Sequence, residues 1–283
     1  MWGASYLFMR VAVPYFGAVA LIEFRVLIAG VALTAFLVAT GGTVGWRKHW
    51  RAFLFVGAVG LATPFVLIAE ALNTIDASTA AILNALAPLF ATIVAAFWIR
   101  DPVTPAKMAG IALCLVGTAL LVGWTPSPMS AHELLAASFS VIATALYGFT
   151  IVFTKVHLKE ASPLGTAAGT LLMAAAALAF AVPFAPPTHP LADIPPIAWM
   201  AMLGLAIVST TVAFIFYYRL IADVGPVKAI TVTLLVPIFG MVWGVIFLGE
   251  PVTPGRLAGC AVILAGCSLI LGLVRFPVRR TAG

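Results

Sequence analysis

The chain has 283 residues, of which 63% are hydrophobic and 8% are charged, and its formal net charge is +6 at pH 7. A soluble domain carries roughly 25% charged residues, so this composition excludes an ordinary water-soluble enzyme and predicts an integral membrane protein. The basic residues are scattered singly rather than clustered, which argues against nucleic-acid binding.

An incomplete helix is expected over residues 1–14, which are too few to span a bilayer and lack the basic segment of a signal peptide. Further along the chain, apolar runs separated by polar, glycine or proline residues predict nine membrane spans: 18–40, 53–73, 77–99, 106–124, 134–154, 164–185, 197–220, 227–248 and 256–275. A bilayer core about 30 Å thick needs about 20 apolar residues per helix, so these runs fill the chain and leave no room for a sizeable soluble domain.

Basic residues are distributed unevenly between the two sides of the predicted bundle. If the chain begins in the cytoplasm, all of its 15 lysines and arginines except Arg10, Arg25 and Arg256 lie at cytoplasmic ends of spans. The positive-inside rule therefore predicts cytoplasmic N- and C-termini, in a multi-pass protein of the bacterial inner membrane.

The chain also contains an internal repeat. A shift of 149 positions aligns DPVTPAKMAG, residues 101–110, with EPVTPGRLAG, residues 250–259, and six of the ten residues are identical. The same shift aligns Pro88 with Pro237 and Gly117 with Gly266. A match without gaps over two helices indicates an ancient duplication.

We therefore predict two five-helix halves, residues 1–124 and 134–275, joined by a linker at residues 125–133. Because five is odd, the second half enters the membrane upside down relative to the first. In transporters, such inverted repeats place the substrate site near the midplane, between the halves.

The first helix is related to the first helix of the second half. At a shift of 145 positions, Trp2 falls on Tyr147 and Phe8 on Phe153. The helix containing Tyr147 begins about thirteen residues before it, so a full-length first helix is expected to need roughly that many residues ahead of Met1.

Several of these motifs occur together in one known family. The early Trp2-Gly3 pair, the two mid-helix prolines, and the runs GEPVTPGRLAG at 249–259 and LAGCSLIL at 264–271 resemble the EamA-type branch of the drug/metabolite transporter superfamily over nearly the whole chain. Arg100 and Asp101 replace the usual glycine and glutamate, so the first copy of the motif is degenerate.

This resemblance implies an all-α membrane protein: a basket of ten helices with a central cavity, walled by the spans 53–73, 77–99, 197–220 and 227–248. It also implies export of amino acids, other metabolites or toxic cations, and the sequence is most similar in pattern to exporters of aromatic amino acids. Export of cationic drugs or other metabolites is the alternative.

The sequence favours a secondary transporter working by alternating access, because it contains no nucleotide-binding motif. An intramembrane enzyme would need histidine or acidic clusters within spans, whereas all four histidines fall in loops; a channel would need a filter-like loop or a charged ring. We expect no catalytic residues, cofactor or metal, and only a small-molecule substrate and the lipid bilayer as partners. One chain supplies both halves, so a monomer is sufficient.

Two prolines point to part of the binding site. Pro88 and Pro237 lie in mid-helix, where the missing N–H frees the backbone carbonyls of Asn84 and Thr233 near the midplane. We expect these four residues to line the substrate cavity. The alternative is a purely structural kink.

Four aromatic residues are further candidates for substrate contact. Trp2, Tyr6, Tyr147 and Tyr217 could stack on an aromatic or cationic substrate. Membrane aromatics also gather at the lipid interface without binding anything, and this alternative stays open.

Two charges lie inside predicted spans, where an unpaired charge is costly. Arg25 and Glu70 are therefore expected to act in gating or in charge coupling with the substrate, and they could pair with each other. A structural ion pair or snorkelling to the headgroups is the alternative. The sequence leaves proton antiport and facilitated diffusion equally open.

Overall fold

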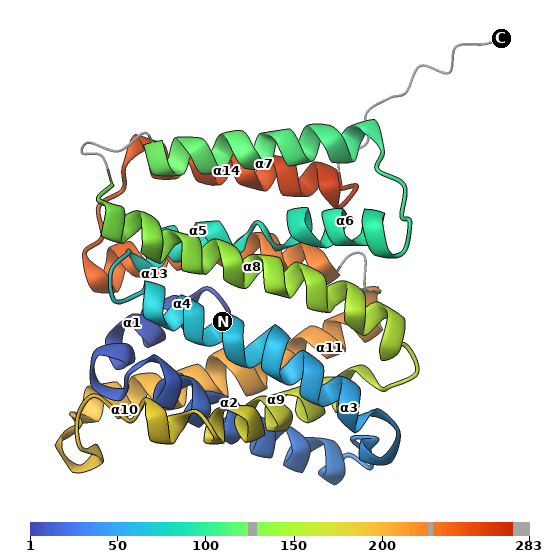
Figure 1. Cartoon of the computed structure of the whole chain (residues 1–283), viewed down its shortest axis with the longest axis vertical. Coiled ribbons are helices and arrows are strands. Elements are labelled where there is room, and N and C mark those ends of the chain that lie inside the picture. Colours follow the sequence, from blue (N-terminus) through green and yellow to red (C-terminus); the bar gives the residue numbers. More distant parts are fainter. Residues whose placement is uncertain (124–128, 226–228, 274–283) are drawn as a thin grey trace.

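The computed structural model describes residues 1–123, 129–225 and 229–273, and every regular element within these ranges is helical. Figure 1 shows the helices running across the view in stacked layers, with α7 and α14 together at one edge. The elements of the first half are α1 (Ala4–Phe16), α2 (Ala18–Ala39), α3 (Trp46–Gly57), η1 (Ala58–Ala62), α4 (Thr63–Ala71), α5 (Ala77–Asn84), α6 (Ala87–Trp98) and α7 (Pro105–Gly123).

The second half repeats this order of helices. Its elements are α8 (Ala131–His157), α9 (Pro163–Ala179), η2 (Val182–Phe184), η3 (Leu191–Asp193), α10 (Pro196–Leu203), η4 (Gly204–Val212), α11 (Ala213–Val224), η5 (Ile230–Leu234), α13 (Leu235–Leu248) and α14 (Pro254–Ile270). Of the predicted linker, Ala131 and the residues after it already belong to α8, whereas residues 125–128 lie outside the described ranges. So do Lys228 and the basic residues after 273. The division into halves stays a prediction.

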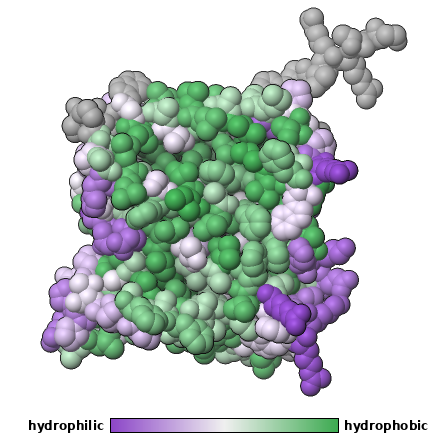
Figure 2. Space-filling model, in the orientation of Figure 1, coloured by the Kyte–Doolittle hydropathy of each residue, from purple (hydrophilic) through white to green (hydrophobic). Residues whose placement is uncertain are grey.

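Eight helical stretches are long and apolar enough to cross a membrane, and α14 is a shorter apolar helix. Figure 2 shows apolar side chains across the middle of the visible face and hydrophilic ones at the two edges where helices end. With α1, these elements make the ten-helix, all-α membrane bundle that the sequence predicts. The spans themselves extend beyond several predicted bounds, as in Trp46–Ala71 and Pro196–Val224.

The turns gather at two opposite ends of the bundle. At the end that we call the Glu250 end, the backbone N–H of His189 donates to the carbonyl of Tyr15 (3.1 Å). At the opposite end, which we call the Asp101 end, Lys48 forms an ion pair with Glu160. Each end thus joins turns from both predicted halves.

The closest helix contact is between α7 and α14. A Cβ atom on Gly110 would lie 2.6 Å from the carbonyl oxygen of Gly266, and one on Gly117 would lie 3.0 Å from that of Gly259. The helices are therefore antiparallel, and only glycine allows their backbones to approach so closely. The shift of 149 exchanges these two contacts, as a two-fold relation between inverted copies requires.

Four spans predicted to be continuous are interrupted near their middle. The π-helical segments η1 and η4 divide 46–71 and 196–224, and the shift of 149 places η1 within η4. A turn at residues 85–86 separates α5 from α6, and the 3₁₀ segment η5 precedes α13. These are the four helices that the resemblance implies as cavity walls, and such interruptions are frequent at functional sites.

The glycine contacts generate a stability prediction. We expect Gly266→Ala to lower the free energy of unfolding by about 1–3 kcal/mol, because the new methyl would overlap the Gly110 carbonyl. Thermal unfolding of the purified protein in detergent measures this. The matched control is Gly123→Ala, whose Cβ would meet nothing within 4 Å. Equal melting temperatures for both variants would show that the α7–α14 contact is not tight.

Candidate functional site

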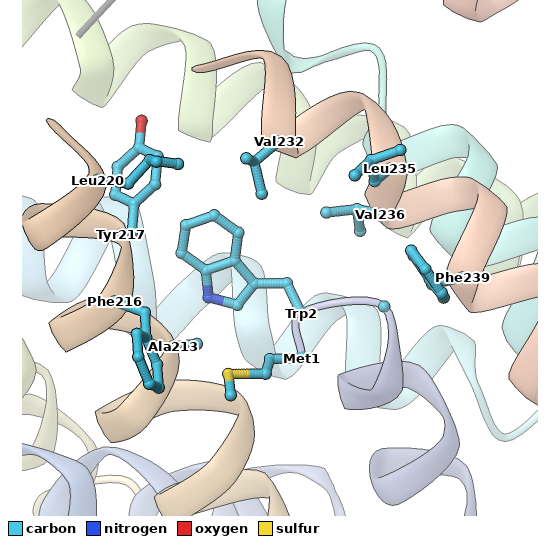
Figure 3. Close-up of a pocket in the computed structure, with 11 residues that line it drawn as sticks. Met1, Trp2, Ala213, Phe216, Tyr217, Leu220, Val232, Leu235, Val236 and Phe239 are labelled. Atoms are coloured by element: carbon cyan, nitrogen blue, oxygen red, sulfur yellow. The ribbon is translucent and has the colours of Figure 1, made fainter. Parts of the chain in front are cut away.

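An apolar pocket of about 250 Å³ opens between the start of the chain, α11 and the η5–α13 segment. Figure 3 shows the Trp2 indole at its centre, with Phe216 and Tyr217 on one side and Val232, Leu235 and Val236 on the other. The remaining lining residues are Met1, Gly3, Ala213, Leu220 and Phe239. The walls thus come from both predicted halves of the chain.

The pocket has one strongly aromatic side. The ring of Trp2 lies 5.0 Å from that of Tyr217, centroid to centroid, and 5.9 Å from Phe214 in an edge-to-face arrangement. Tyr218 stacks in turn on Phe214. Two of the predicted aromatic residues, Trp2 and Tyr217, are therefore brought together, on a surface suited to a flat apolar group.

A polar cluster surrounds Arg25 of α2, and its member Thr210 lies in η4, directly before the pocket helix α11. The Arg25 side chain is only 4% exposed, its Nε donates to Thr210 Oγ1 (3.1 Å), and its Nη1 contacts Met9 Sδ at 3.8 Å. The guanidinium carbon lies 3.8 Å from the centre of the Phe65 ring, a cation–π contact. Every one of these partners is neutral, and no ion pair to Arg25 occurs within the ranges that the structure describes.

Two predicted residues, Tyr6 and Tyr147, lie near this cation, and a third, Asn84, lies next to Tyr6. The hydroxyl groups of Tyr6 and Tyr147 lie within electrostatic range of Arg25, and Tyr6 also interacts with the Asn84 side chain. The Tyr147 ring packs edge-to-face on Phe65 at 6.2 Å. Asn84 Oδ1 is buried and has no hydrogen-bond partner within the described ranges.

The predicted pairing of Arg25 with Glu70 is wrong. Glu70 lies at the exposed end of α4, where one carboxylate oxygen accepts a hydrogen bond from Asn73 Nδ2 (3.4 Å). Water or headgroups can solvate a carboxylate at a helix end, so burial in a pair is not required. A gating role for Glu70 stays a prediction.

Both prolines lie in the first turn of a helix that follows an interruption, whereas the sequence predicted them in the middle of continuous helices. Pro88 is the second residue of α6, directly after the turn that ends α5 at Asn84. Pro237 lies buried in the first turn of α13, after Thr233 of η5. Both positions tolerate proline because the first turn of a helix has no intrahelical acceptor for these N–H groups. Among these residues Pro237 is buried, whereas Asn84, Pro88 and Thr233 are partly buried.

A second polar arrangement joins α5 to the turn after α13, and we call it the clasp. Glu250 is 7% exposed; its carboxylate accepts from the backbone N–H groups of Ala77 (2.7 Å) and Ser78 (2.9 Å) and from the Ser78 hydroxyl. Beside it, Arg256 forms an ion pair with Asp76. A carboxylate at a helix N-terminus satisfies otherwise unpaired N–H groups and faces the positive end of the helix dipole.

The repeat counterpart of the clasp is different. Asp101, which aligns with Glu250, pairs instead with Lys107 in the first turn of α7 (2.8 Å), and both side chains are partly exposed. The hydrogen bond from the Lys107 ammonium holds the pKa of the Asp101 carboxyl below its ordinary value. The two ends of the bundle are therefore held unequally.

Sequence reasoning missed several of these contributors. Glu250 was noted only as part of a motif, and Phe65 and Met9 were not predicted to contact Arg25. The repeat contained one signal that could have pointed to Glu250. The shift of 149 aligns Glu250 with Asp101, and these acids directly follow the aligned residues Gly249 and Arg100.

Comparison with known proteins places this geometry in context. The sequence pattern that defines the EamA-like transporter family matches residues 1–123 and 134–272. A probable terminal-alkyne amino-acid exporter of Streptantibioticus cattleyicolor is 27% identical over 95% of this chain and 89% of its own length. The uncharacterized inner membrane transporter YedA of Escherichia coli strain K12 is 25% identical over 99% of this chain and 90% of its own length.

A solved crystal structure has the same fold. It superposes with a TM-score of 0.68 at 20% sequence identity, covering 95% of this chain and 91% of its own. At this identity the match concerns the fold alone.

The clasp predicts unequal effects at the two repeat positions. We expect Glu250→Ala to lower the free energy of unfolding by about 1–3 kcal/mol, because it leaves the N–H groups of Ala77 and Ser78 unpaired. The matched control Asp101→Ala removes only a partly exposed pair, worth at most about 1 kcal/mol. Melting temperatures in one detergent compare them, and an equal loss for both would contradict the assignment.

Proposed function

Because the chain belongs to the EamA-like transporter family, we propose that this membrane transporter exports amino acids, aromatic ones among them, across the bacterial inner membrane by alternating access. The observation that carries the proposal is the aromatic-walled pocket between Trp2 of the first half and Tyr217 and Val236 of the second. A site between two inverted halves is exposed to one side or the other as the halves rock.

The shape and lining of the pocket support amphiphilic substrates. Its walls are apolar and aromatic, and the pocket helix α11 directly follows Thr210, the hydrogen-bond partner of Arg25. We therefore place the apolar end of the ligand among the aromatic rings and its polar end toward Arg25. The similarity to an amino-acid exporter of another organism favours the same class of substrate. We regard cationic drugs as the alternative class.

The clasp supports the alternating-access part of the proposal. Glu250 and the Asp76–Arg256 pair join α5 to the α13–α14 turn, and α13 packs along α5 behind them, where a Cβ on Gly240 would lie 2.4 Å from that of Ala81. We assign the clasp as the closed gate of this conformation. Passage of substrate through the Glu250 end then requires the carboxylate to release the N-terminus of α5.

Transport is tested by counterflow in proteoliposomes. Vesicles loaded with unlabelled L-phenylalanine are expected to accumulate labelled L-phenylalanine transiently, because exchange through a carrier needs no external energy. Trp2→Ala is expected to raise the half-saturating concentration about 2- to 10-fold by removing the Tyr217 contact.

The matched control for this test is Trp50→Ala, which removes an exposed tryptophan of α3 that does not line the pocket. A panel of labelled amino acids and cationic drugs runs in parallel. Accumulation of the drugs alone would overturn the substrate class, and product formation without net movement of any compound would overturn transport.

The proposed orientation, with the Asp101 end in the cytoplasm, makes a labelling prediction. In intact spheroplasts, a membrane-impermeant maleimide is expected to modify Ala192→Cys, which lies exposed at the Glu250 end. Lys159→Cys, exposed at the Asp101 end, is expected to react only after permeabilisation. The native cysteines are buried, so the unsubstituted protein serves as the background. The reverse labelling pattern would invert the proposed topology.

A further inference from the structure

We propose that Arg25, Tyr6 and Asn84 form a head-group site for zwitterionic α-amino acids, in which Arg25 binds the α-carboxylate and Asn84 Oδ1 accepts from the α-ammonium. This inference rests on the proposed transport function and names the substrate class of the same site.

The first argument is the missing counter-ion of Arg25. A guanidinium stays charged in a protein, and burying it inside a membrane protein is costly unless an opposite charge or several hydrogen bonds compensate. Arg25 is 4% exposed, yet its contacts are one hydroxyl, one thioether and one aromatic face. A ligand carboxylate supplies the charge that the described residues do not.

We assign that carboxylate to the edge of the guanidinium formed by its two terminal nitrogens. Phe65 covers a face of the plane and Thr210 occupies the Nε side, whereas the contact of Nη1 with Met9 Sδ is long and weak, at 3.8 Å. The edge formed by the two terminal nitrogens matches a carboxylate in the bidentate arrangement that arginine favours. Displacing a thioether contact from this edge costs little.

The second argument is the unpartnered oxygen of Asn84. A buried carbonyl oxygen without a donor is unfavourable, and Asn84 Oδ1 has none within the described ranges. The Tyr6 hydroxyl lies within hydrogen-bonding reach of the Asn84 side chain and within electrostatic range of Arg25. A ligand carrying a donor close to its carboxylate, as an α-amino acid does, satisfies both ends of this cluster together.

The third argument is the position of the apolar pocket relative to the cluster. Tyr6 lies in the first turn of α1, and Trp2, which lines the pocket, lies in the turn directly before that helix. A head group at Tyr6 therefore places an amino-acid side chain toward Trp2 and the pocket. A monoamine would bring a second cation to Arg25, and a simple carboxylate would leave Asn84 unpaired.

Binding of matched analogues to the purified full chain tests this assignment. The probes are L-phenylalanine, phenethylamine, which lacks the carboxylate, and 3-phenylpropionate, which lacks the ammonium. Wild type is expected to bind L-phenylalanine at least about tenfold more tightly than either analogue, measured by isothermal titration calorimetry. Equal affinity for phenethylamine and L-phenylalanine would overturn the assignment without the need for any variant.

Two substitutions separate the roles of the two side chains. Arg25→Gln is expected to abolish the preference for L-phenylalanine over phenethylamine, and Asn84→Leu the preference over 3-phenylpropionate. Arg51→Gln removes an exposed cation of α3 and serves as the control, with unchanged preferences. If Arg25→Gln does not fold, Asn84→Leu and the wild-type panel still decide the outcome.

The outcomes also separate this inference from the proposed function. Counterflow of L-phenylalanine with preferences that survive in Arg25→Gln and Asn84→Leu would overturn the head-group site and leave amino-acid transport standing. Absence of binding and counterflow for every amino acid tested would overturn both.

Discussion

Inside a bilayer, water cannot solvate an open backbone group or a charge, so each must find its partner within the protein. The structure meets this constraint in two ways. Where helices must be continuous, as in α7 and α14, glycines bring two backbones into contact. Where helices are interrupted, other groups take over: Cys267 Sγ donates to the carbonyl of Ala85 (3.0 Å) in the turn between α5 and α6. One interrupted segment, η4, also carries the buried hydroxyl groups of Ser209, Thr210 and Thr211, which give the bundle a polar middle.

The sequence predicted the bundle well because its signals are local or periodic. Runs of apolar residues define spans by length alone. The repeat aligned Gly117 with Gly266, but it did not predict that the two helices carrying them contact each other. Proline chemistry likewise marked the position of Pro88, where the structure has a break between α5 and α6. These inferences need no knowledge of which helices are neighbours.

The candidate site was less predictable, because its partners come from distant parts of the chain. Nothing in the sequence indicates that Arg25 packs on Phe65 and Thr210, 40 and 185 residues away, rather than on the acid Glu70. Simple charge matching favoured Glu70, whereas the described contacts of Arg25 are a hydroxyl, a thioether and an aromatic face, none of them an acid. The clasp could not be predicted for the same reason. A motif identifies Glu250, but only the packing of α5 on α13 shows that its carboxylate accepts a hydrogen bond from the backbone N–H of Ala77.

The degenerate first copy of the repeat has a structural counterpart. Gly249 and Arg100 occupy equivalent turns in the two copies of the repeat, and both adopt a positive φ, 65° and 53°. An arginine reaches that conformation only at a steric cost. The backbone of the turn has therefore persisted where the side chains have changed. The acid of the first copy, Asp101, contacts Lys107 in the helix that directly follows it, rather than the N-terminus of a helix distant in the sequence.

Unequal fastening at the two ends has a kinetic consequence. A carrier whose two access states have the same energy shows similar half-saturation from either compartment, whereas one that rests predominantly in a single state does not. The buried Glu250 carboxylate joins two helices at one end of the bundle, whereas the other end has the partly exposed Asp101–Lys107 pair. The empty protein is therefore expected to rest predominantly in the state that faces one compartment. Reorientation of the empty carrier, and not of the loaded one, would then limit the rate of unidirectional transport. Substrate in the trans compartment would raise that rate, because the carrier then returns loaded.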